Sequence, residues 1–247
     1  MATLIKAEHQ FQGAFAKDYA FLQLICPAVT ACAQRSSEAL ARLPGHPDGQ
    51  PLKVLEIGCG SGLSTRAFLD ARTDLFVEAI DLAPTMLDQA RHNLAADLAS
   101  GKLVLHLTDA LSFLEKTPSD SLDVVMSNYA IHNFLDEYRA IVLKELFRVM
   151  KPGAFFINGD RYGMDDPVQH LKALQEEVRG YFRVFKSMER WDLLEDWVIH
   201  VLSDESLDHV MRLTPSLDCM RTTGFVDIEI LHRETVNTNL IARKALA

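Results

Sequence analysis

The sequence predicts an α/β fold in which a doubly wound, seven-stranded and mostly parallel sheet is covered by helices on both faces. Short apolar runs alternate with helical patterns from residue 53 onward, and this alternation is typical of parallel strands joined by helical crossovers. A glycine-rich turn follows the first run. The last two runs lie too close together for a helical crossover, so they are expected to form an antiparallel pair.

The first 51 residues predict a helical lid followed by a linker. Apolar residues recur at three- and four-residue steps through residues 1–43, including Phe15 and Tyr19, as in an amphipathic helix. The next eight residues, PGHPDGQP, contain three prolines and two glycines, which cannot continue a helix. The sequence therefore divides into a lid and linker at 1–51 and an α/β domain at 52–247.

Five runs rich in branched and other apolar residues predict the parallel strands, at 53–57, 75–80, 103–107, 122–127 and 154–158. The stretches between them predict helices at 63–71, 84–99, 110–116 and 135–150. Pro84 suits the first turn of its helix. The aromatic-bearing stretch at about 165–213 has no strand signal and predicts a helical insertion.

One further helix and two strands complete the predicted fold. Thr214 is expected to cap the helix, Pro215 to occupy its first position and Gly224 to end it. The runs at 225–232 and 238–244 predict the antiparallel pair.

Composition narrows the class of ligand. The chain has 34 acidic and 25 basic residues, a net charge of -9, and no dense block of Lys and Arg. Because nucleic-acid binders present a basic face, a small-molecule partner is expected and a nucleic acid is not; a homodimer stays open. No apolar run approaches the roughly 18 residues of a membrane span and no leader is evident, so a cytoplasmic location without membrane contact is expected. The four cysteines lack metal-type spacing, so reduced thiols and no metal are expected.

The stretch VLEIGCGSGLST, residues 54–65, predicts a nucleoside site. A dinucleotide fingerprint requires glycine at position 63, where the sequence has Leu63, and no G-K-[ST] follows as in a P-loop. Glu56 stands directly before the loop, where a carboxylate would repel phosphate and suit a positively charged ligand. We therefore expect a cationic nucleoside.

Two more acids end neighbouring predicted strands. Asp81 ends the second and can accept hydrogen bonds from both hydroxyls of a ribose, and Asp109 ends the third. The carboxyl ends of parallel strands converge on one crevice, so Glu56, Asp81 and Asp109 can line one ligand. Alternatively, Glu56 could bond the loop's own N–H groups and Asp109 could cap the next helix.

Five ordered motifs, LEIGCGSG, IDLAPTML, TDA, SNYAIHNF and VMKPGAFF, resemble those of the class I S-adenosylmethionine-dependent methyltransferases. The resemblance covers residues 52–160 well and 214–244 in outline. It implies a Rossmann-like methyltransferase fold, S-adenosylmethionine as cofactor, and methyl transfer as the reaction. It implies these cofactor-binding residues: Glu56, Gly58, Cys59, Gly60 and Gly62 at the methionine part, Asp81 at the ribose, Leu82 and Met86 on the adenine, Asp109 and Ala110 at its amino group, and Asn128 at the amino acid end.

Methyl transfer needs few catalytic groups, because positioning supplies most of the rate and a base is needed only when the acceptor must lose a proton of high pKa. His132 follows the fourth strand and Asp160 the fifth, so both are candidate catalytic residues at the crevice. The alternatives are that His132 orients its loop and that Asp160 is a cap or an ion-pair partner of Arg161. His106 is expected to make a core or crossover contact, and for His200 a core-facing position is an equal alternative.

The insertion is expected to enclose a small-molecule acceptor. Its aromatic residues Phe182, Phe185, Trp191 and Trp197 could form an acceptor pocket or only the packing face of a lid that excludes water. A weaker resemblance, through residues 15–27, 189–197 and NLIARK, is to the carboxy-S-adenosylmethionine synthases. It implies a non-methylating use of the cofactor, with Arg190 as the candidate partner of an additional carboxylate. A non-catalytic cofactor-binding module is the remaining alternative.

Overall fold

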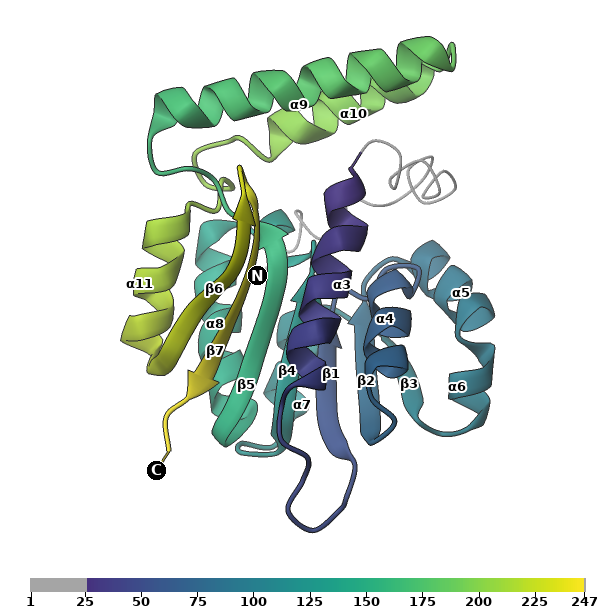
Figure 1. The fold of residues 1–247 in the computed structure, drawn as a ribbon, viewed down its shortest axis with the longest axis vertical. Helices are drawn as coiled ribbons and strands as arrows, with labels where there is room; N and C mark the ends of the chain where they lie inside the picture. Colours follow the sequence, from purple (N-terminus) through teal and green to yellow (C-terminus); the bar gives the residue numbers. More distant parts are fainter. Residues whose placement is uncertain (1–25, 247) are drawn as a thin grey trace.

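The computed structural model describes residues 26–246 and contains one seven-stranded sheet (Figure 1). The strand order is β3-β2-β1-β4-β5-β7-β6. The first five strands are parallel, while β7 is antiparallel to both β5 and β6. The fold class predicted from the sequence is therefore confirmed. The strands are β1 (Leu52–Ile57), β2 (Leu75–Asp81), β3 (Leu103–Leu107), β4 (Leu122–Asn128), β5 (Met150–Arg161), β6 (Phe225–Glu234) and β7 (Asn237–Lys244).

Each face of the sheet has its own hydrophobic core. Leu55 and Ile57 of β1 pack into the core shared with α7 (Ala110–Lys116), α8 (Asp136–Val149) and α11 (Leu213–Thr223). Val54, directly before Leu55, packs into the core on the other face, because side chains alternate between faces along a strand. That second core contains residues of α3 (Pro27–Ala41), α4 (Leu63–Ala71) and α5 (Pro84–Asn93).

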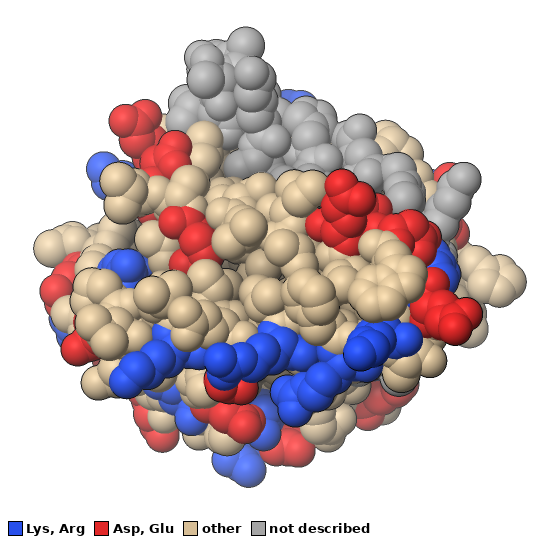
Figure 2. Space-filling model, turned by 90° about the horizontal axis from the view of Figure 1, so that it is seen from above, with Lys and Arg blue, Asp and Glu red and all other residues tan. Residues whose placement is uncertain are grey.

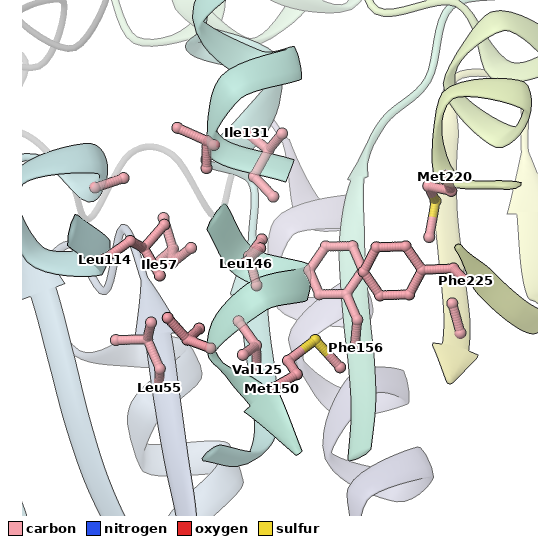
Figure 3. Packing of buried hydrophobic residues seen from close by; sticks show 14 of the residues in the cluster. Leu55, Ile57, Leu114, Val125, Ile131, Leu146, Met150, Phe156, Met220 and Phe225 are labelled. Carbon is pink, nitrogen blue, oxygen red and sulfur yellow. The ribbon is translucent and has the colours of Figure 1, made fainter. Parts of the chain in front are cut away.

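The α8 side of the sheet is packed around aromatic rings (Figure 3). Phe156 of β5 lies 5.9 Å, centroid to centroid, from Phe225 of β6, with Leu146, Met150 and Met220 around the pair. Burial of an aromatic side chain stabilises the fold by about 2–3 kcal/mol. This packing fixes β5, the strand that carries Asp160 at its carboxyl end.

Three elements differ from the expected boundaries. The expected helix 84–99 is two helices, α5 and α6 (Ala95–Ala99), which meet at the buried Leu94. β5 begins at Met150, directly after α8. Thr214 is not a cap, because α11 begins at Leu213 and Thr214 donates hydrogen bonds to Asp165 through its N–H and its hydroxyl. Gly224 ends α11 in the left-handed conformation, as expected.

The expected insertion forms two helices above the carboxyl ends of the strands (Figure 1), α9 (Pro167–Ser187) and α10 (Trp191–Ser203). They pack together through Tyr181, Phe185 and Trp197, and this cluster also contains Val29 of α3. The expected lid residues Phe15 and Tyr19 lie outside the described residues. Within residues 26–246, no helix is both long and apolar enough to cross a membrane.

Candidate active site

One pocket lies between the carboxyl ends of the strands and the helices α9 and α10. In a doubly wound sheet, the strand order reverses at β1 and β4, and the connections there open a crevice. Nine residues predicted from the sequence line this pocket: Gly58, Gly60, Asp81, Leu82, Met86, Asp109, Ala110, Asn128 and His132.

Asp81 holds the glycine loop in place. Its two carboxylate oxygens accept hydrogen bonds of 2.8 Å from the N–H groups of Gly60 and Ala83. Burial raises the pKa of Asp81, and these two hydrogen bonds oppose the rise. Each carboxylate oxygen has a second lone pair, so Asp81 can accept ribose hydroxyls while it still holds the loop.

Glu56 lies beneath the loop rather than in the pocket. It is fully buried, and its two oxygens accept hydrogen bonds from Ser64 Oγ at 2.5 Å and Thr65 Oγ1 at 2.6 Å in the first turn of α4. Glu56 does not line the pocket formed by the described residues. In this structure it joins β1 to α4, so direct contact with the cofactor remains a prediction.

Burial raises the pKa of Glu56 to about 7, although the Ser64 and Thr65 hydrogen bonds oppose this shift. Between its ordinary value of 4.5 and about 7, the folded protein therefore binds more protons at this site than the unfolded chain does. The contribution of Glu56 to the free energy of unfolding should fall by about 3 kcal/mol as pH rises through this window. Urea unfolding at pH 5 and pH 8 measures the fall, and Glu56→Gln should remove most of it. If the free energy of unfolding changed equally between pH 5 and pH 8 in both proteins, this prediction would be wrong.

Gly58 allows the loop to pass close to the segment after β4. Its φ is +71°, and an added Cβ would lie 2.3 Å from the Cβ of Ala130. The predicted loop residues Cys59 and Gly62 do not line the pocket that the described chain forms. Gly62 instead packs against Leu94, and burial raises the pKa of the Cys59 thiol well above its usual range. A buried thiol with a raised pKa carries little thiolate, which disfavours reactivity.

Gly58→Ala should abolish cofactor binding and destabilise the fold. The added Cβ would collide with the Cβ of Ala130, which can move only if the backbone moves. Gly101→Ala is the matched control, since Gly101 has a φ of +73° and nothing within 4 Å of an added Cβ. The control should cost only the left-handed strain of about 1–2 kcal/mol, and Gly58→Ala several kcal/mol more. Thermal unfolding and calorimetry with S-adenosylhomocysteine measure both effects. Equal losses in the two variants would show that the contact with Ala130 is unimportant.

Asp109 and Asn128 provide polar groups on opposite sides of the pocket. Asp109 caps α7 by accepting from the Ser112 N–H at 2.8 Å; burial raises its pKa, but hydrogen bonds from Ser112 and Tyr138 outweigh this and leave it lowered. Asn128 donates to the Val29 carbonyl at 3.2 Å. Its Oδ1 is buried without a hydrogen-bond partner in the part of the chain that the structure describes and lies beside Gly159 of β5.

His132 and Asp160 form a buried pair. His132 lies in η2 (Ile131–Asn133), and its Nδ1 is 2.5 Å from Asp160 Oδ1. Asp160 is fully buried and also accepts from the N–H groups of Ile131, His132 and Arg161. A carboxylate on Nδ1 selects the tautomer in which Nε2 is the basic nitrogen. His132 lines the pocket, whereas Asp160 reaches it only through His132.

The roof of the pocket contains a second ionic group. Arg161, which ends β5, lies with Nη1 2.6 Å from Glu177 Oε1 of α9. Tyr181, one helical turn after Glu177, donates to the same oxygen at 2.6 Å. The side chains that complete this side of the pocket are Tyr129, Trp197, His200 and Asp204.

The aromatic residues of the insertion divide into two groups. Trp197 lines the pocket and Phe185 is buried in the α9–α10 core, whereas Phe182 and Trp191 are exposed. Arg190 pairs with Asp192 at 2.8 Å and does not line the pocket within residues 26–246. The arginine that lines the pocket is Arg161. The position of Arg190 therefore does not support its expected role as the partner of an additional carboxylate.

The sequence patterns did not indicate the polar residues of the roof, that is, of the side of the pocket formed by α9 and α10. Glu177 lies on the inner face of α9 with Tyr181, and Asp204 follows His200 by one turn at the end of α10. The available signal was a polar residue on the apolar face of an amphipathic helix. His200, for which a core-facing position was an equal alternative, lines the pocket, whereas His106 bonds Glu78 of β2 at 3.1 Å.

The sheet order, the glycine loop and Asp81 at the end of β2 together define a nucleoside-binding domain of the methyltransferase type. Residues 54–153 match the family model described as "Methyltransferase domain". Residues 54–153 therefore form a methyltransferase domain, and S-adenosylmethionine is the cofactor of this domain. The residues fit this cofactor: Gly58 and Gly60 line the pocket with a backbone free of side chains, and Asp81 retains lone pairs for its ribose.

The chain is similar to enzymes with different acceptors. It is 23% identical over 191 residues to the tRNA N(3)-cytidine methyltransferase METTL6 of Homo sapiens, which covers 77% of this chain and 61% of that protein. It is 37% identical over 144 residues to the malonyl-[acyl-carrier protein] O-methyltransferase of Halorhodospira halophila, covering 58% of this chain and 45% of that protein. The chain thus spans less than two thirds of either relative.

A solved structure shows the same fold. The O-methyltransferase family protein from Burkholderia thailandensis superposes with a TM-score of 0.61 at 19% identity, over 90% of this chain and 58% of that one.

The expectation that no nucleic acid is a partner is wrong, since METTL6 is named for a tRNA substrate. The expectation depended on the absence of a dense basic block. Four exposed basic residues of α9, Lys172, Arg179, Arg183 and Lys186, instead follow one another at steps of seven, four and three residues, so they share one face of the helix. On the side of the molecule where α9 lies, basic side chains form a row (Figure 2). The basic face of α9 is therefore indicated by the helical spacing of these residues and not by their density along the chain.

Proposed function

We propose that the protein transfers a methyl group from S-adenosylmethionine to an acceptor small enough to enter the pocket beneath α9 and α10, with His132 as general base. One observation carries the proposal. A single pocket is lined both by the cofactor-side residues, such as Asp81, and by His132 and the roof residues Trp197 and Asp204. An acceptor beneath the roof would therefore lie next to the cofactor.

When bound, S-adenosylmethionine supplies a methyl group activated by the adjoining sulfonium. The chain's own residues then have three tasks. His132 Nε2 takes the proton that the acceptor loses, and Asp160 stabilises the resulting imidazolium. Tyr181 and Trp197 close the roof and exclude water. The loop held by Asp81 keeps the cofactor in one position, which supplies the positioning on which the rate depends.

The test has two steps. Calorimetry with S-adenosylhomocysteine first measures cofactor binding. The protein is then incubated with methyl-labelled S-adenosylmethionine and a cell extract that has been separated into small-molecule and RNA fractions. Label in the small-molecule fraction supports the proposal. Binding without transfer to any fraction would indicate a non-catalytic module, and a carboxylated cofactor mass after purification would indicate the non-methylating alternative.

A nucleotide of an RNA is a second candidate acceptor. It is favoured by the four basic residues on the outer face of α9. The opposite face of the same helix provides Glu177 and Tyr181 to the pocket. A phosphate backbone on the outer face would lie about one helix diameter, ~10 Å, from the pocket. Such binding would be independent of base sequence and sensitive to salt.

Replacing Lys172, Arg179, Arg183 and Lys186 with alanine should weaken binding of unfractionated transfer RNA. The slope of log K against log salt should become shallower by about 0.7 for each cation that contacts a single strand. The matched control replaces four exposed basic residues on other elements: Arg42, Arg91, Lys102 and Lys116. Equal slopes in the two quadruple variants would reject α9 as the RNA-binding face. Fluorescence anisotropy at several salt concentrations gives the slopes.

A further inference from the structure

The carboxylates around the acceptor side of the pocket differ in how well they are paired. Glu177 has Arg161 at 2.6 Å and the Tyr181 hydroxyl at 2.6 Å. Asp160 has His132 and three backbone N–H groups. These two carboxylates are therefore satisfied by the protein itself.

Asp204 is the exception. It lines the pocket, is only 6% exposed, and its Oδ1 has no hydrogen-bond partner within residues 26–246. Its Oδ2 lies 3.7 Å from His200 Nε2, beyond hydrogen-bond distance. Burial lowers the pKa of His200, although the nearby Asp204 opposes this shift. The pocket arginine, Arg161, is engaged by Glu177.

The position of Asp204 is unfavourable for the fold alone. It is the C-cap residue of α10, and the carboxyl end of a helix carries partial negative charge, which disfavours a carboxylate there. A buried acceptor without a partner also loses the hydrogen bonds it had with water. A side chain that breaks both rules without local compensation is typical of a functional site.

The chemistry of the surroundings fits a nitrogen donor. Tyr129, Tyr181 and Trp197 line the same side of the pocket, and aromatic faces attract cationic groups. A carboxylate or phosphate ligand would instead be repelled by the Asp204 carboxylate.

We infer that Asp204 selects acceptors that bear an N–H donor, either an alkylammonium group or the amino group of a heterocycle, and rejects anionic acceptors at this position. The inference rests on the proposed function, because it assigns the acceptor of the same pocket. Asp204 is thereby a specificity-determining residue rather than a base, since His132 has that role.

Matched probes test this inference on protein saturated with S-adenosylhomocysteine. In the first pair, tryptamine carries an ammonium group where indole-3-propionate carries a carboxylate. In the second pair, cytidine carries an amino group where uridine has a carbonyl oxygen. Wild type should bind the N–H-bearing member of at least one pair about tenfold more tightly or better. Preference within the first pair alone indicates an ammonium acceptor, and within the second alone a heterocyclic amine.

Asp204→Asn should reduce the preference to less than threefold while binding of S-adenosylhomocysteine stays within twofold of wild type. Asp196→Asn on the same helix is the control and should keep the preference, because Asp196 is not among the pocket-lining residues of the described chain. If wild type did not bind S-adenosylhomocysteine, the proposed function would fail. The cofactor measurement thus distinguishes failure of the proposed function from failure of the inference about Asp204. Equal or tighter binding of indole-3-propionate and uridine, or an unchanged preference in Asp204→Asn, would overturn the inference.

Discussion

Asp81→Ala should weaken binding of S-adenosylhomocysteine by about two orders of magnitude or more. The variant loses the carboxylate that accepts from the N–H groups of Gly60 and Ala83, and with it the predicted acceptor for the ribose hydroxyls. Hydrogen bonds to a charged group contribute about 1.5–3 kcal/mol each, so the loss of two corresponds to 3–6 kcal/mol. Isothermal titration calorimetry measures the affinity directly.

Two variants separate the role of Asp81 from a general charge effect. Asp81→Asn keeps one oxygen acceptor and should bind with intermediate affinity. Asp88→Ala removes an exposed carboxylate of α5 that pairs with Arg91, and it should bind as wild type does. Wild-type affinity in Asp81→Ala would show that this carboxylate does not contact the cofactor.

The sequence was most informative where one residue pattern decides the structure. The run KVLEI alternates between two cores because side chains alternate along a strand, so β1 was located to within one residue. Two of the three acids expected at one crevice lie there, since parallel strands place their carboxyl ends together. Asp81 and Asp109 line the pocket for that reason.

The sequence was least informative where function depends on contacts between distant elements. Glu56 was placed in the pocket because it precedes the loop, but hydroxyls at positions 64 and 65 hold it beneath. The direction of its side chain depends on the packing of α4, which no local pattern specifies. Likewise, Arg161 meets Glu177 only because α9 crosses above β5.

The pairing of His132 with Asp160 leads to a second prediction of large effect, on the rate of methyl transfer. Asp160→Asn should lower kcat by about 10²–10⁴-fold with KM for S-adenosylmethionine unchanged. Asparagine can present its Nδ2 to His132 Nδ1, which would make Nε2 the protonated nitrogen and remove the base. Asp160→Ala should in addition destabilise the fold by about 3 kcal/mol, because the N–H groups of Ile131 and His132 lose their buried acceptor.

A double-mutant cycle with His132→Gln distinguishes a catalytic pair from two independent structural contacts. If Asp160 acts through His132, the double variant should be no slower than either single variant, because the two side chains perform one task. Rates come from labelled-methyl transfer to whichever extract fraction accepts label from the wild-type protein, and thermal unfolding shows which variants remain folded. Multiplicative losses in a folded double variant would mean that Asp160 contributes independently of the imidazole. In that case His132 would only orient its loop, and the proton would leave the acceptor by another route.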